Sequence, residues 1–179
     1  MENFMVDLET LGRRPGCIVL SVGGVMFDPE SGQLGEEFYT VISQSSCANY
    51  DMHIDPDTAE WWRKRSPEAQ LVLREAKSPD APSLKLVCSA IGGFLKPHGT
   101  GIKVWGNGAN FDNPVLAECF RRTGVKQPWE FWDDRCYRTL KNLYPQVKME
   151  KSGVQHNALA DAKQQAAHAL KIFEYMKNA

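Results

Sequence analysis

Phe4-Met5-Val6-Asp7-Leu8-Glu9-Thr10 is the stretch around which the rest of the chain is organised. Successive side chains on a strand point to opposite faces, so Phe4, Val6 and Leu8 share one face. Asp7 and Glu9 share the other. Two carboxylates this close repel each other, and burial raises their pKa unless a cation offsets both effects. Mg²⁺ or Mn²⁺ prefers such oxygen ligands. For these two residues alone, a strand face open to water is the simpler interpretation.

The size and composition of the chain limit its domain organisation, its partners and its compartment. At 179 residues it is long enough for one well-packed domain and short for two, so we expect a single domain over 1–179. The net charge of −1 provides no global positive field, so any contact with nucleic acid must come from local basic clusters or bound metal. The five cysteines are scattered without a C-x-x-C pair, which argues against a zinc site and a disulfide framework and fits a reducing cytoplasm. We expect no signal peptide and no membrane contact, since no apolar run approaches 18 residues.

The order of the expected elements indicates the fold class. Strands at 4–10, 18–27 and 37–42, joined by short links, are most simply an antiparallel meander, with a bulge expected at Gly23 and Gly24. Residues 43–56 are expected to be irregular. Helices are then expected from 57 or 58, over 67–76, 83–95 and 114–123, up to 143, and over 158–176, with further strands at 102–105 and 131–136. This order predicts an α/β fold with a mixed sheet flanked by helices.

Three further residues carry groups suited to catalysis, although each also has a simpler explanation. Asp112 follows a short strand at the start of a helix, where an aspartate is often only an N-cap. Asp161 falls in the first turn or so of the last helix, where its charge interacts favourably with the helix dipole. His156 precedes it by five residues in a polar segment, where a lone histidine is commonly solvated. Taken singly, none of the three indicates a function.

As an ordered set, these residues form a specific pattern. Val6-Asp7-Leu8-Glu9-Thr10, Asn110-Phe111-Asp112-Asn113-Pro114 and His156-Asn157-Ala158-Leu159-Ala160-Asp161-Ala162 span nearly the whole chain. This pattern resembles the three motifs of the DEDD superfamily of 3′–5′ exonucleases, in the DEDDh branch. A sister branch has tyrosine four positions before the last aspartate, and Asn157 stands there instead. The stretch from Leu8 through Val25 and the segment Trp61-Trp62-Arg63 look most like the RNase AS-like exoribonucleases.

The resemblance implies an RNase H-like fold, two divalent metal ions and a homodimer. Four carboxylates, those of Asp7, Glu9, Asp112 and Asp161, would balance the four charges of two Mg²⁺ ions, for which Mn²⁺ would substitute. His156 would act as the general base toward the attacking water, a role for which histidine is well suited among the side chains. The implied reaction is hydrolysis of single-stranded RNA from its 3′ end to 5′-mononucleotides.

Substrate contacts are less strongly indicated by the sequence. Trp61 and Trp62 are adjacent on a helix and cannot share a face, so one is expected in the core while the other could stack on a base. The other candidates near the motifs are Thr10, Leu11, Asn110 and Phe111. Candidate phosphate contacts are Arg13, Arg14, Arg63, Lys64, Arg65, Arg121 and Arg122. His53, His98 and His168 have no partner pattern and are assigned structural roles.

Two alternatives remain beside the exoribonuclease. A DNA-directed 3′–5′ exonuclease would use the same mechanism, and no short motif reports which side chain reads the 2′-OH of RNA. A catalytically inactive relative could serve as a nucleic-acid-binding module. Loss of a metal-binding carboxylate would favour that alternative, and all four are present.

Overall fold

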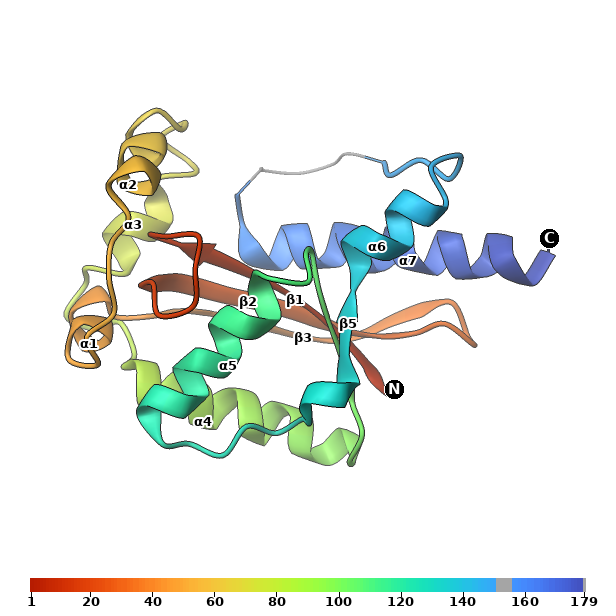
Figure 1. Ribbon diagram of the computed structural model, residues 1–179, viewed down its shortest axis with the longest axis horizontal. Coiled ribbons are helices and arrows are strands. Elements are labelled where there is room, and N and C mark those ends of the chain that lie inside the picture. Colours follow the sequence, from red (N-terminus) through yellow and green to blue (C-terminus); the bar gives the residue numbers. More distant parts are fainter. Residues whose placement is uncertain (151–155, 179) are drawn as a thin grey trace.

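The computed structural model describes residues 1–150 and 156–178. Within them, five strands form one sheet in the order β3-β2-β1-β4-β5, with helices on both of its faces (Figure 1). The strands are β1 (Asn3–Thr10), β2 (Val19–Asp28), β3 (Gln33–Val41), β4 (Lys103–Gly106) and β5 (Asp134–Cys136). The first three form the expected antiparallel meander, β4 pairs parallel with β1, and β5 pairs parallel with β4. The predicted mixed sheet is confirmed.

Several of the helices begin at a capping residue, and one ends at a glycine. The helices are α1 (Gln44–Ala48), α2 (Pro56–Arg63), α3 (Leu71–Glu75), α4 (Leu84–Leu95), α5 (Asp112–Thr123), α6 (Tyr137–Leu143) and α7 (Ala158–Asn178), with short 3₁₀ turns at Lys96–His98 and Phe131–Asp133. The Asp55 side chain caps α2, which has Pro56 at its start, and the hydroxyl of Ser83 caps α4. Gly124 ends α5 in the left-handed conformation that glycine adopts without strain. None of the described helices is long and apolar enough to cross a membrane.

Each face of the sheet has its own core. Phe4, Val6 and Leu8 of β1 pack with the buried residues of α4 and α5, including Ile91 and Leu116. The opposite face is covered by α7, where Met5 and its neighbours meet three small buried residues, Ala162, Ala166 and Ala169. The alternation predicted for β1 is therefore confirmed, and it directs Asp7 and Glu9 toward α7.

Several sequence-based boundaries were wrong. Residues 43–56, predicted to be irregular, contain α1, and the predicted helix over 67–76 is helical only as α3. The predicted strand over 131–136 begins with a 3₁₀ turn and is extended only at β5. No bulge occurs at Gly23 and Gly24, because their pairing with β1 is regular and the register shifts lie between Glu9 and Thr10 and between Val25 and Phe27.

The lengths of β1 and β4 create the space for a site. β4 pairs with β1 only from Asn3 to Met5, and β1 continues to Thr10. Beyond that pairing, the chain leaves β4 at Gly106 and returns as α5 at Asp112 (Figure 1). Side chains at the carboxyl end of β1 therefore have no neighbouring strand on the β4 side. In α/β folds, ligands commonly bind at the carboxyl ends of the strands.

Candidate active site

Two carboxylates of the site come from β1. Asp7 accepts a hydrogen bond from the Gln165 side-chain amide of α7 at 2.7 Å. Burial raises the pKa of Asp7 well above its usual range, and the negative charges of the other three carboxylates, Asp112, Glu9 and Asp161, raise it further. Glu9 is only 7% exposed, and burial together with the charges of Asp161 and Asp112 raises its pKa to about 8.

Asp112 reaches the same place from the other side of β1. Its carboxylate accepts a hydrogen bond from the backbone N–H of Asn107 at 2.8 Å. Burial raises the pKa of Asp112 to about 6, against the opposing effect of that hydrogen bond and of one from the Leu8 backbone. Phe111, and not Asp112, occupies the N-cap position of α5, so the simple capping explanation is wrong. Gly106 makes this approach feasible, because a Cβ there would collide with the side chains of Asn113 and Asp112.

Asp161 and His156 are held together at the start of α7. The backbone N–H of His156 donates to Asp161 Oδ2 at 3.1 Å, and His156 itself has a left-handed backbone with φ of 64°. Burial raises the pKa of Asp161. Gly23 of β2 allows this segment to lie against the sheet, because a Cβ at Gly23 would collide with the backbone of Ala158 and Leu159. The glycine that suggested a bulge thus serves close packing of α7.

This arrangement has the properties of a divalent cation site. Ligand atoms of Glu9, His156 and Asp161 lie within 4.8 Å of one another. Among the described residues, no lysine or arginine forms an ion pair with these carboxylates or with Asp7 and Asp112. Each of the four carboxylates has a raised pKa, with burial as the largest cause, so a bound cation would stabilise their ionised forms. Hard oxygen donors in such a setting fit Mg²⁺ or Mn²⁺.

Two tryptophans of α2 border the histidine. The ring of Trp61 meets the His156 ring edge to face, with 4.8 Å between centroids, and the Trp62 ring lies at 6.2 Å. Trp62 is 1% exposed and its indole N–H donates to the backbone oxygen of Thr10 at 2.8 Å, whereas Trp61 is 38% exposed. The prediction that one of the pair is core is therefore confirmed for Trp62. Trp61 remains accessible beside the carboxylates.

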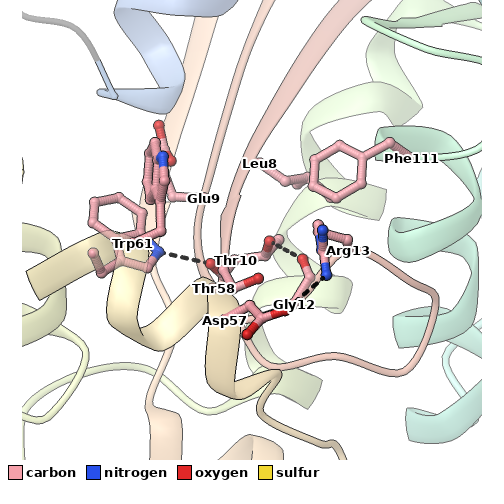
Figure 2. Close-up of a pocket in the computed structure, with 10 residues that line it drawn as sticks. Leu8, Glu9, Thr10, Gly12, Arg13, Asp57, Thr58, Trp61 and Phe111 are labelled. Carbon is pink, nitrogen blue, oxygen red and sulfur yellow. Dashed lines mark hydrogen bonds and ion pairs between the residues drawn. The ribbon is translucent and has the colours of Figure 1, made fainter. Parts of the chain in front are cut away.

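A pocket of about 430 Å³ opens next to these side chains. In Figure 2, Phe111 and Arg13 lie on one side of it and Trp61 on the other, with Thr10 between them. The lining residues are Leu8, Glu9, Thr10, Gly12, Arg13, Asp57, Thr58, Trp61, Trp62 and Phe111. The walls are thus aromatic and aliphatic, while Glu9 belongs to both the pocket and the carboxylate cluster. Such a pocket can hold a flat ring with its polar end toward the carboxylates.

The predicted substrate contacts are only partly brought to this pocket. Thr10, Phe111 and the two tryptophans line it. Leu11 does not, because it is 4% exposed and packs in the core between sheet and helices. Asn110 is exposed and also lies outside the lining. The sequence did not predict that Leu8, Asp57 and Thr58 line the pocket. The alternation along β1 assigned Leu8 to the core, and Asp57 and Thr58 belong to α2, which is far from the three motifs in the sequence.

Most of the predicted phosphate-binding cations are already neutralised. Arg13 pairs with Asp55 and Asp57, and Arg63 and Lys64 pair with Glu60. Arg121 and Arg122 both pair with Glu118, away from the pocket lining. Arg65 lies over the Trp61 ring, 4.4 Å from its centroid. Arg14 and His53 line a separate hollow with Arg13.

The other histidines have packing or surface partners. His168 is 5% exposed, and its Nδ1 and Nε2 lie 2.7 Å from the Tyr137 hydroxyl and 2.8 Å from the Val147 backbone oxygen. The Nε2 atom of His98 lies 3.1 Å from Glu36. Sequence reasoning gave no role to Gln165, although its position one turn after Asp161 is the signal that could have found it.

Comparisons with known proteins agree with this geometry. The chain is 25% identical over 162 residues, 78% of its length and 70% of the relative's, to a protein called "Exodeoxyribonuclease" from Enterobacteria phage T4. Its fold is similar to the nuclease domain of 3′hExo, a DEDDh family member bound to rAMP (TM-score 0.64, 13% identity, 97% of this chain and 92% of that one). It is also similar to Exonuclease X in complex with 5′ overhanging duplex DNA (TM-score 0.57, 19% identity, 98% and 93% covered). A third similar structure is E. coli Exonuclease I with a dA16 oligonucleotide (TM-score 0.66, 15% identity, 98% and 43% covered).

These similarities identify the fold as the RNase H-like fold of the DEDDh exonucleases. The chain is a nuclease of the 3′–5′ exonuclease type, in a family that typically depends on metal ions. A family model matches residues 2–173, which leaves only Met1 and residues 174–179 outside it. The chain belongs to the family described as the 3′-5′ exoribonuclease Rv2179c-like domain.

Proposed function

We propose that this protein removes 5′-mononucleotides from the 3′ end of single-stranded RNA. The observation that carries the proposal is the convergence of Asp7, Glu9, Asp112 and Asp161 beside a pocket with aromatic walls. The family description supports RNA as the substrate. A pocket open at the surface suits a chain end, whose terminal base can stack on Phe111 or Trp61.

Two Mg²⁺ ions would be held by the four carboxylates, with Mn²⁺ as a substitute. When bound, they would supply the positive charge that these side chains lack and would stabilise the negative charge developing on the phosphodiester. The support for this cofactor is the raised pKa of every member of the cluster, none of which forms an ion pair with a lysine or arginine of the described residues.

His156 would accept the proton of the attacking water. The hydrogen bond from its backbone N–H to Asp161 holds the residue beside the cluster, and its ring packs against the ring of Trp61. A histidine is suited to this step because its ordinary pKa lies near neutrality. Gln165 would orient Asp7 through the amide hydrogen bond.

Matched single-stranded RNA and DNA oligonucleotides of the same base sequence test the substrate. Each carries a 5′ label and is incubated with Mg²⁺ or Mn²⁺, with EDTA as control. Faster stepwise shortening of RNA from the 3′ end supports the proposal. Faster shortening of DNA would support the exodeoxyribonuclease alternative, which the phage relative's name favours.

We also propose a homodimer, as the family resemblance implies. The exposed aromatic side chains Phe131 and Trp132, 75% and 63% accessible, offer apolar surface of the kind that anchors interfaces. A monomeric mass by light scattering at micromolar concentration would contradict it.

A further inference from the structure

Two cations of α6 lie beside the carboxylate cluster. The guanidinium of Arg138 rests against the turn at Gly108, where a Cβ would come 3.4 Å from its Cζ atom. Gly108 precedes Asp112 by four residues, and the positive charge of Arg138 lowers the pKa of Asp112. One turn further along α6, Lys141 Nζ lies 3.4 Å from Asn107 Oδ1 in the same loop. Both cations therefore border the loop that carries Asp112.

Among the described residues these two cations have no carboxylate partner, unlike Arg13, Arg63 and Lys64 near the pocket. Neither Arg138 nor Lys141 forms an ion pair with an Asp or Glu of the described residues. The sequence from Lys151 to Gln155 contains no acidic residue. Burial and the charge of Arg138 lower the pKa of Lys141, so the two cations lie close enough to repel each other. An anion held between them would relieve that repulsion.

The position of the pair relative to the pocket indicates which anion. The aromatic pocket lies at α2, and α6 lies on the other side of the loop between β4 and α5 (Figure 1). If the terminal nucleoside occupies the pocket and its phosphodiester meets the carboxylates, the remaining chain has to leave past this loop. We propose that Arg138 and Lys141 bind the phosphate group that precedes the scissile one in the substrate. This inference rests on the proposed function. The planar fork of an arginine matches phosphate oxygens, and lysine adds a point charge.

Two dinucleotides that differ only in a 5′-phosphate test this subsite. Both contain one scissile phosphodiester, but only the phosphorylated one carries the preceding phosphate. The wild type should favour the phosphorylated dinucleotide by about tenfold or more in kcat/KM, the effect of one hydrogen bond between charged groups. Arg138→Met should reduce that ratio to near one, and Lys141→Met should reduce it partly. Arg135→Met is the matched control, because its guanidinium donates to the backbone oxygens of Trp132 and Asp134, and it should keep the wild-type ratio.

The outcomes separate this subsite from the proposed function. Equal kcat/KM values of the wild type for the two dinucleotides would overturn the inference while leaving the exonuclease intact. So would an equal fall on both dinucleotides in Arg138→Met, because the ratio would then be unchanged. Calorimetric binding of the same dinucleotides with Ca²⁺ in place of Mg²⁺ provides a readout that needs no hydrolysis. If the phosphorylated dinucleotide binds no tighter than the other, the subsite does not exist, whether or not the protein cleaves either one.

Discussion

Replacing Glu9 by Gln should stabilise the protein when divalent cations are absent. The folded protein holds Glu9 at a pKa of about 8 instead of 4.5 because it is buried among Asp161 and Asp112. At about 1.4 kcal/mol for each pKa unit, that rise means that ionised Glu9 destabilises the folded state by roughly 5 kcal/mol. The neighbouring carboxylates can take up protons in place of Glu9, which reduces this cost. We therefore expect Glu9→Gln to raise the free energy of unfolding by about 2–4 kcal/mol at pH 8. Glutamine has nearly the shape of the protonated glutamate and carries no charge.

The direction of the pH dependence follows from linkage. A carboxyl whose folded pKa is raised contributes its full stability below the unfolded value of 4.5, and this contribution is lost as pH rises through about 8. The metal-free wild type should therefore be more stable at pH 5 than at pH 8. Near pH 5 the difference between wild type and Glu9→Gln should shrink to below about 1 kcal/mol, because most of Glu9 is then protonated in the folded state.

Thermal unfolding in EDTA at pH 5 and pH 8 measures both effects. For a chain of this size, we expect Tm of Glu9→Gln to exceed that of the wild type at pH 8 by about 4–16 °C. Excess Mn²⁺ should reverse the order, because the wild type gains a ligand that the variant lacks. Glu174→Gln, an exposed change on α7 of equal charge, is the control and should leave Tm nearly unchanged. A variant no more stable than wild type at pH 8 in EDTA would refute this reasoning.

The remaining predictions concern the site and its packing. His156→Ala should lower turnover by roughly 10²–10⁴-fold, the usual size of a general-base contribution, while calorimetry shows nearly unchanged Mn²⁺ affinity. Asp7→Ala should lower both turnover and affinity, and wild-type turnover in the His156→Ala enzyme would remove the histidine from the mechanism. Gly23→Ala should destabilise the protein by about 1–3 kcal/mol in chemical denaturation and reduce activity, because its Cβ would displace the start of α7. Gly92→Ala is its control: the space around Gly92 is open in α4, and alanine should raise stability by about 0.5–1 kcal/mol there.

The sequence predicted those features that local periodicity and order along the chain determine. The alternation in β1 correctly separated Leu8 from Asp7, since a strand has only two faces. The order of the strands along the chain predicted the meander, because short links leave few other pairings. The order and spacing of the three motifs predicted Asp112 and Asp161 as metal ligands, although each residue alone had a simpler explanation.

The features that sequence missed depend on distant partners. Gly23 is a regular member of its strand, and its purpose is visible only once α7 lies against it. Arg138 follows a strand of three residues, and nothing nearby in sequence indicates that its guanidinium meets the turn at Gly108. Leu11 was grouped with Thr10 by adjacency, yet the end of β1 buries it in the core. In each case the deciding contact joins residues far apart along the chain, which local patterns do not encode.

The contact between Trp61 and His156 gives the protein an optical reporter of its own site. Indole emission is quenched by a protonated imidazole in contact with it, and the two rings meet with 4.8 Å between centroids. Fluorescence that changes as protons or divalent ions enter the cluster would thus follow binding without any attached dye. Subtracting the emission of Trp61→Phe isolates this signal from that of the other four tryptophans. The contact that borders the candidate general base therefore also allows ion binding to be followed while it occurs.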